Sequence, residues 1–241
     1  MLITRRSLIS LLTASIAFPA FAQMKDENTN NLRIGIIGSG SLGGTVGKLW
    51  VRAGHEVMFS SRHPDELLSV IRDLGPRASA GTPRQAAEFG SVVLFAVPYE
   101  ALPGLGRDLQ DPLRGKIVLD ATNPSLSSSN ALSREALAKG VGETSETYLP
   151  GTRLVRAFSA TDASAIQGRS GRQTDKVAIP IAGNDPAAVQ TAVQLVRDAG
   201  CDPLVVGNLA AARSFQQGGP GFRANTTLPD LRRRLGLPDG G

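Results

Sequence analysis

The sequence predicts an α/β fold with a doubly wound, mostly parallel sheet and a small C-terminal extension. Three observations lead to this prediction. Short apolar runs that are typical of buried parallel strands recur along the chain. Between them lie segments that begin and end like helices, with Thr82-Pro83 before one helix and Gly200 after another. The first apolar run leads directly into a glycine-rich turn at residues 38–43.

The first 22 residues have the three parts of a cleavable signal peptide. Arg5 and Arg6 supply a positive start, residues 8–18 are largely apolar, and Ala20-Phe21-Ala22 forms a small-x-small cleavage site. The apolar part is too short to anchor the chain in a membrane. The segment around the two arginines resembles the twin-arginine signal, so we expect export to the periplasm by that route. An ordinary secretory signal that holds two arginines is the alternative.

A β-α-β unit follows a polar linker at residues 23–31. The apolar residues 32–37 lead into Gly38-Ser39-Gly40-Ser41-Leu42-Gly43, which has the G-x-G-x-x-G spacing of dinucleotide-binding turns. Gly38 permits the tight turn, Gly40 lets a pyrophosphate approach, and Gly43 lets helix and strand pack closely. The helix is predicted to end at Gly54, with a second strand at residues 56–60. We interpret this as a Rossmann unit; a merely tight glycine turn is the alternative.

The end of the second strand indicates which dinucleotide binds. NAD binders usually place a carboxylate there, whereas this chain has Ser60-Ser61-Arg62-His63. The Arg62 guanidinium is a planar set of donors that suits a 2′-phosphate, so NADP(H) is the predicted cofactor. The alternative is an exposed arginine on a loop. His63 either touches the phosphate or is incidental, and His55 is expected to be structural.

Further apolar runs predict the rest of the sheet. They lie at residues 92–97, 116–120, 154–158, 177–182 and 204–206, with a helix at 186–199. The predicted Rossmann domain therefore spans residues 32–207, and a helical or loop extension spans 208–241. Ala96, Val97 and Pro98 lie at the end of one of these strands and Asn123 follows another, at the edge where open α/β sheets bind ligands. Ordinary strand-to-loop turns are the alternative for these four residues.

Composition excludes several classes of function. The net charge is +5, and removal of Arg5 and Arg6 leaves 5 − 2 = +3, which is too weak to indicate a nucleic-acid partner. Aromatic residues make up only 5% of the chain, so a base-stacking surface is not expected. Cys201 is the only cysteine, which excludes an intramolecular disulfide and a cysteine metal cluster; we expect a buried, unreactive thiol and no metal site.

Common dehydrogenase chemistries lack their residues here. A short-chain dehydrogenase needs Tyr-x-x-x-Lys, but Tyr99 and Tyr148 are followed at that spacing by Pro103 and Thr152. A lactate-type enzyme needs a histidine acid near the nicotinamide, and the only two histidines lie in the first half of the fold. A flavin-like or deazaflavin ring needs little help with protons, because its redox chemistry is its own.

The ordered motifs resemble the NADP oxidoreductases that depend on the deazaflavin coenzyme F420. The resemblance rests on R-I-G-I-I-G-S-G-S-L-G-G, L-F-A-V-P-Y-E-A, G-K-I-V-L-D-A-T-N-P, L-P-G-T-R-L-V-R-A-F and I-P-I-A-G-N-D-P. It implies that the pyrophosphate binds at Ser39, Gly40, Ser41 and Leu42, and that Ser61 and Arg62 bind the 2′-phosphate. It also implies that Val97 and Pro98 flank the nicotinamide. Ser159 and Ala160 would face the ring of the acceptor.

The reading that follows is an exported NADPH-dependent oxidoreductase. It would transfer a hydride between NADP(H) and a flavin-like or deazaflavin acceptor. Family members commonly have Asn or His where this chain has Ser159. The alternative is therefore an NADP-binding module without turnover, acting as a redox sensor or docking on a partner. The sequence is compatible with either a monomer or a homodimer.

Overall fold

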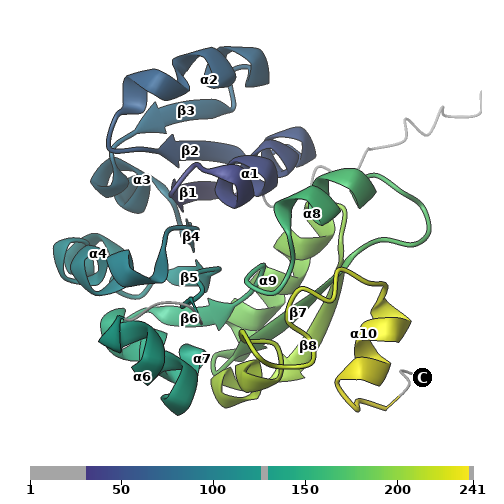
Figure 1. Ribbon diagram of the computed structural model, residues 1–241. Helices are drawn as coiled ribbons and strands as arrows, with labels where there is room; N and C mark the ends of the chain where they lie inside the picture. Colours follow the sequence, from purple (N-terminus) through teal and green to yellow (C-terminus); the bar gives the residue numbers. More distant parts are fainter. Residues whose placement is uncertain (1–30, 126–129, 239–241) are drawn as a thin grey trace, which may run out of the picture. The chain divides into compact units, whose positions relative to one another are not determined.

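The protein is described here by a computed structural model that covers residues 31–125 and 130–238. The predicted signal peptide and nearly all of the predicted linker lie outside the described residues. The described chain forms one eight-stranded sheet (Figure 1). In spatial order the strands are β3 (Ala78–Gly81), β2 (Glu56–Ser60), β1 (Arg33–Ile37), β4 (Val92–Phe95), β5 (Ile117–Asp120), β6 (Arg153–Arg156), β7 (Ala178–Gly183) and β8 (Asp202–Gly207).

The sheet is parallel throughout except at one junction. Strands β3 to β6 pair in parallel, and β7 pairs with β8 in parallel, but β6 and β7 are antiparallel. The order 3-2-1-4-5-6 is that of a Rossmann domain, so the predicted fold class is confirmed. Because β7 runs the other way, its carboxyl end and that of β8 lie at the opposite edge of the sheet.

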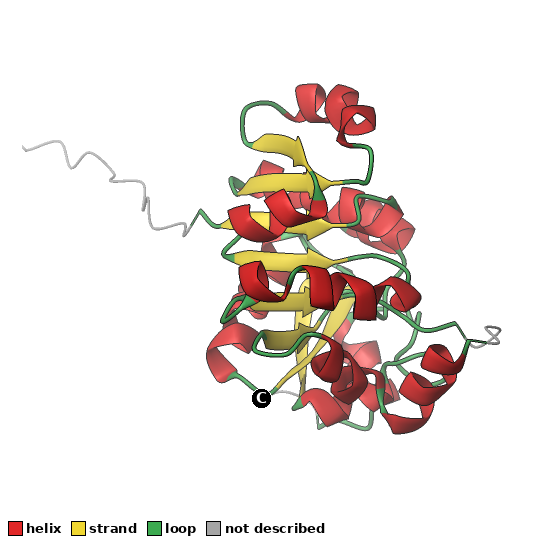
Figure 2. Ribbon diagram, turned by 90° about the vertical axis from the view of Figure 1, so that its left-hand side faces the viewer, coloured by secondary structure: helices red, strands yellow, loops and turns green. Residues whose placement is uncertain are grey.

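Helices cover both faces of the sheet, as Figures 1 and 2 show. One face carries α1 (Ser41–Ala53), α2 (Leu68–Leu74), α8 (Ala163–Arg169) and α9 (Pro186–Asp198). The other carries α3 (Pro83–Phe89), α4 (Leu102–Asp108), α5 (Gln110–Leu113), α6 (Ala131–Lys139) and α7 (Val141–Tyr148). Three 3₁₀ helices, η1 (Pro64–Leu67), η2 (Tyr99–Ala101) and η3 (Leu209–Ser214), and the final helix α10 (Leu228–Arg234) complete the described structure.

The strands are apolar because each packs on both faces. In β4, Val92 and Leu94 point into the core under α1 and α9, while Val93 and Phe95 point into the core under α3 and α4. Side chains of a strand alternate between the two faces, so a fully apolar run is what two covering layers require. Trp50 joins two helices on one face, since its ring N–H donates to the carbonyl of Leu195 at 2.8 Å.

Local signals predicted most boundaries to within two residues. The largest shifts are at the ends of β4 and β6 and at the start of β8, which was predicted at 204–206 and spans Asp202–Gly207. Strand β3 is the one strand of the first six for which the sequence predicts no bounds, because its sequence A-S-A-G has none of the β-branched or aromatic residues that favour strands. The run predicted to reach residue 97 ends as a strand at Phe95. The run predicted to reach residue 158 ends at Arg156, since Phe158 adopts a left-handed conformation with φ of 62°.

Candidate functional site

The carboxyl ends of six parallel strands meet at one edge of the sheet. Ile37 is paired in register with Ser60 on one side and with Phe95 on the other. The same row continues through Asp120 to Arg156. All the candidate site residues follow this row within a few positions: Gly38 to Gly43 after β1, Ser61 and Arg62 after β2, Ala96 to Pro98 after β4, Asn123 after β5, and Ser159 and Ala160 after β6.

The glycine-rich turn leaves the amino end of α1 open. Gly38 has a φ of 97°, which favours glycine, and a Cβ there would lie 2.5 Å from the carbonyl oxygen of Ala96. Gly40 is the N-cap of α1, and no side chain caps the first turn. A Cβ on Gly40 would meet nothing within 4 Å. The first backbone N–H groups of a helix carry partial positive charge, so this end of α1 suits an anion such as a pyrophosphate.

A free guanidinium lies at the end of β2. Arg62 is exposed and makes no hydrogen bond or ion pair with the residues that the structure describes. Ser61 closes the turn beside it, because its hydroxyl oxygen accepts the N–H of His63 at 3.0 Å. Ser60 is buried and its hydroxyl donates to the carbonyl of Ile36 at 2.6 Å. The polar side chains of this turn that a ligand can reach are therefore those of Ser61, Arg62 and the exposed His63.

Two hollows adjoin the glycine turn and share Ser41. One, of about 200 Å³, lies between α1 and α2 and is lined by Ser39, Gly40, Ser41, Gly44, Thr45, Lys48, Phe59, Leu67, Val70 and Ile71. The other, of about 340 Å³, lies at the ends of β5 and β6 and is lined by Ser41, Leu42, Asn123, Phe158, Ser159, Thr161, Asp162, Ala163, Phe222 and Arg223. We call the second the β5–β6 cavity. Together the hollows could hold an extended ligand across the amino end of α1.

The β5–β6 cavity contains some of the sequence candidates and not others. Asn123 and Ser159 line it, and so do Ser41 and Leu42 from the glycine turn. Ala160 is buried and does not line it; its carbonyl accepts the N–H of Arg223 at 2.8 Å. Val97 packs against the glycine turn instead, since its Cγ1 would lie 2.7 Å from a Cβ on Gly38.

Two charged residues of this cavity were not predicted from the sequence. Asp162 is the N-cap residue of α8, and Arg223 comes from the C-terminal segment that returns to the site. The Arg223 Nε lies 2.8 Å from a carboxylate oxygen of Asp162. The Asn225 side-chain amide also donates to Asp162 at 2.6 Å. The N-cap position of Asp162 is a local signal, but nothing local links it to Arg223.

The titratable side chains considered from the sequence do not serve as proton donors in this cavity. His55 lies at the start of β2, at the opposite edge. Its Nδ1 accepts the N–H of Leu32 at 3.1 Å, so its Nε2 carries the proton that faces Asp198 at 3.0 Å. Tyr99 is fully buried, and burial raises the pKa of its hydroxyl. Cys201 is also buried, which raises the pKa of its thiol to about 12.

Among residues 31–125 and 130–238 there is no group of three or more His, Cys, Asp or Glu side chains placed to hold a metal ion. No helix within those ranges has both the length and the apolar character that crossing a membrane requires.

The comparisons with known proteins agree with this geometry. Residues 33–124 match the family model described as NADP oxidoreductase, coenzyme F420-dependent. The rat metalloreductase STEAP3 is 27% identical over 184 residues, which are 76% of this chain and 36% of that protein. Human metalloreductase STEAP2 is 24% identical over 193 residues, 79% of this chain and 36% of that protein. The chain thus spans little more than a third of the length of these curated relatives.

Solved structures show the same fold. A hypothetical protein from Sinorhizobium meliloti has a TM-score of 0.68 and 25% identity, over 80% of this chain and 93% of that one. A protein from Arthrobacter, provisionally described as an F420-dependent NADP-reductase, has a TM-score of 0.63 and 22% identity, over 86% and 96%. The resemblance stated from the sequence is confirmed, most directly over residues 33–124.

Proposed function

We propose that this chain, whose residues 33–124 match the coenzyme F420-dependent NADP oxidoreductases, is an NADPH-dependent oxidoreductase with a flavin-like or deazaflavin acceptor. One observation carries the proposal. The register of the sheet aligns the open amino end of α1 with the free guanidinium of Arg62 on one strand row. A dinucleotide with a 2′-phosphate has anionic groups that fit both places.

Different residues at this edge of the sheet would bind different parts of the cofactor. The N–H groups after Gly40 would bind the pyrophosphate, and Ser61 with Arg62 would bind the 2′-phosphate. Ser41, in the glycine turn, also lines the β5–β6 cavity. This cavity would therefore hold the nicotinamide of the cofactor and the acceptor ring that stacks against it. When bound, NADPH supplies the hydride. The side chains that line the β5–β6 cavity would bind and orient the two rings.

The acceptor follows from what lines the β5–β6 cavity. Its carboxylate, Asp162, is held by Arg223 and Asn225, and no histidine, tyrosine or lysine lines it. Reduction of a carbonyl group to an alcohol needs a proton donor at the reacting oxygen. A flavin-like or deazaflavin ring needs less of this help, which supports it as the acceptor class.

The alternative is an NADP-binding module without turnover. The β5–β6 cavity has no histidine, tyrosine or lysine in its lining, and its Asp162 is held by Arg223 and Asn225. This favours the module, because binding alone needs only the glycine turn and Arg62. A sensor or docking subunit would bind NADPH and oxidise it no faster than the free cofactor reacts.

A direct experiment separates the two. The protein without residues 1–22 is mixed with NADPH and with FMN, FAD, riboflavin, coenzyme F420 or a ferric chelate, and loss of absorbance at the nicotinamide band is followed. Turnover with one of these that Gly40→Val abolishes would support the enzyme. Tight NADPH binding with no turnover on any of them would support the module. Absence of NADPH binding would contradict both.

A further inference from the structure

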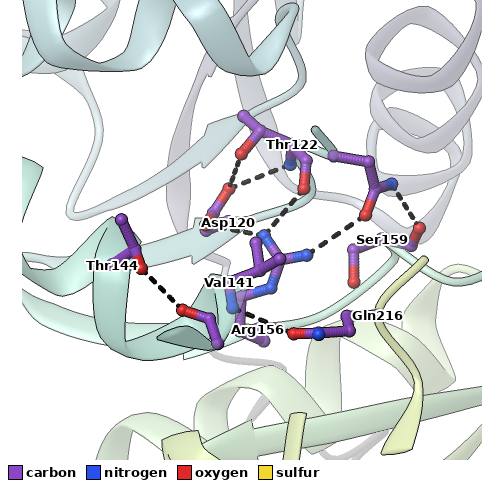
Figure 3. Close-up of polar contacts among 9 residues, drawn as sticks. Asp120, Thr122, Val141, Thr144, Arg156, Ser159 and Gln216 are labelled. Carbon is purple, nitrogen blue, oxygen red and sulfur yellow. Dashed lines mark hydrogen bonds and ion pairs between the residues drawn. The ribbon is translucent and has the colours of Figure 1, made fainter. Parts of the chain in front are cut away.

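A fully buried ion pair lies next to Asn123, which lines the β5–β6 cavity. Arg156 and Asp120 are both 0% exposed, and an Arg156 terminal nitrogen lies 2.7 Å from an Asp120 carboxylate oxygen (Figure 3). The same nitrogen donates to the carbonyl of Thr122 at 2.8 Å. The other Asp120 oxygen accepts the Thr122 N–H at 2.9 Å and its hydroxyl at 2.6 Å. A buried pair is weak evidence for stability alone, because desolvation costs about as much as the attraction returns.

Arg156 also contacts the side-chain amide of Asn123. The second terminal nitrogen of Arg156 donates to the side-chain oxygen of Asn123 at 3.3 Å. The Asn123 side-chain nitrogen donates to the carbonyl of Ser159 at 2.6 Å. A guanidinium only donates and a carbonyl only accepts, so both contacts require the same orientation of the amide. An amide nitrogen has two hydrogens, and these contacts use one of them.

The β5–β6 cavity therefore presents hydrogen-bond donors. Asn123 is half-buried and lines it, with one N–H not used in these contacts. Ser159 also lines it, is 4% exposed, and its hydroxyl has no hydrogen-bond partner among the described residues. The left-handed turn at Phe158 sets the backbone that places Ser159 there. A buried hydroxyl without a partner costs free energy unless a ligand or water satisfies it.

We propose that Arg156 is a positioning residue, which holds the Asn123 amide with its free N–H toward the β5–β6 cavity and so makes that cavity selective for a carbonyl oxygen of the ligand. This inference rests on the proposed function. Two sources have this chemistry: the carboxamide of the nicotinamide and the carbonyls of a flavin-like acceptor.

Arg156→Lys tests the proposal, because one ammonium cannot reproduce the two-armed contact with Asp120 and Asn123. Arg153→Lys is the matched control: it lies on the same strand, pairs with Asp185 and does not touch this network. Dissociation constants are measured for NADP⁺ and for 2′-phospho-ADP-ribose, which lacks the nicotinamide. Acceptor KM and kcat are measured with the best acceptor of the panel.

Arg156→Lys is expected to weaken only one of the measured interactions, and which one it weakens identifies the carbonyl that is bound. If Asn123 binds the nicotinamide carboxamide, the dissociation constant of NADP⁺ should rise about three- to tenfold, the scale of one hydrogen bond. The dissociation constant of 2′-phospho-ADP-ribose should stay unchanged. If the acceptor carbonyl is bound, acceptor KM rises by a similar factor with kcat nearly constant. Arg153→Lys should change none of these.

A double variant separates positioning from a general structural role. If Arg156 acts through Asn123, then adding Arg156→Lys to Asn123→Ala should produce no further selective loss. Equal weakening of NADP⁺ and 2′-phospho-ADP-ribose, or additive losses in the double variant, would overturn the proposal.

A variant at Asn123 keeps the test decisive if Arg156→Lys does not fold. Asn123→Asp keeps the shape but removes both amide hydrogens, so it should show the same selective loss; wild-type values for all ligands would overturn the proposal. If wild-type protein binds neither NADP⁺ nor 2′-phospho-ADP-ribose, the proposed function fails and takes this inference with it. Wild-type binding with unselective variants contradicts only the inference.

Discussion

Gly43 lies against Gly38, so closely that a Cβ on Gly43 would come 2.1 Å from the Gly38 carbonyl oxygen. The same Cβ would lie 3.0 Å from a methyl group of Ile36. Gly40, between them in the turn, has open space where its Cβ would be. One glycine is thus required by helix–strand packing, and the other leaves room that the fold itself does not use.

This contrast predicts two different defects in the glycine turn. Gly40→Val should fold normally and lose NADPH binding, because the branched side chain occupies the space that a pyrophosphate would enter. Gly43→Ala should lower stability by about 1–3 kcal/mol, the usual cost of overpacking. Thermal unfolding and NADPH fluorescence titration of both variants provide the measurement. Normal NADPH binding by Gly40→Val would place the phosphates elsewhere.

Cofactor preference should depend on Arg62. We expect Arg62→Ala to weaken NADPH binding by about 1.5–3 kcal/mol, the scale of charge-assisted hydrogen bonds, and to leave NADH nearly unchanged. Arg72→Ala is the control, because Arg72 is also exposed but lies in the last turn of α2, toward the opposite edge of the sheet. Titration of each variant with both dinucleotides measures the preference. Equal losses for NADPH and NADH would remove Arg62 from the 2′-phosphate.

Acid should destabilise the fold partly through Asp185. Its carboxylate accepts two hydrogen bonds from Arg153, at 2.7 and 2.9 Å, and caps α9 through the N–H of Ala188. The Arg153 contact, more than the cap, holds the pKa of Asp185 well below its usual value. A depressed folded pKa contributes stability above the unfolded pKa of about 3.9, and that stability is lost as pH falls further.

The variant Asp185→Asn isolates this pair, since asparagine still caps a helix. It should be less stable than wild type at pH 7 and should show a shallower loss of stability below about pH 4. Urea unfolding across that pH range is the measurement. Asp111→Asn breaks an exposed pair with Arg114 and should change little. Parallel pH curves for wild type and Asp185→Asn would contradict the assignment.

Export remains a prediction, because residues 1–22 lie outside the described part of the chain. We expect the mature protein to begin near Gln23 and to appear in the periplasm with NADP bound, since a route for folded proteins keeps the cofactor. Replacing both Arg5 and Arg6 with Lys should leave precursor in the cytoplasm, because the receptor reads guanidinium groups and not charge alone. Fractionation and mass spectrometry measure both expectations. Normal export of the double-Lys variant would indicate an ordinary secretory signal.

Sequence by itself determined the features that depend on neighbouring residues. Gly54 ends α1 in the left-handed conformation with φ of 104°, as its position after an apolar helix predicts. Thr82 and Gln85 form a capping box at the start of α3, where Thr82-Pro83 predicted a helix. The glycine turn has the same character, because a strand, a tight turn and a helix start within a dozen residues leave few alternatives.

Only the tertiary structure decided the features that join distant segments. The reversal of β7, the Asp198 carboxylate that fixes His55, and the return of Arg223 to Asp162 have no local signal. The same holds for Arg156, which on the sequence is one arginine in an apolar run and in the fold meets Asp120, 36 residues earlier. A charged side chain in a strand reads as exposed until its partner is known, because burial is tolerated only where another chain segment supplies the opposite charge and the hydrogen bonds.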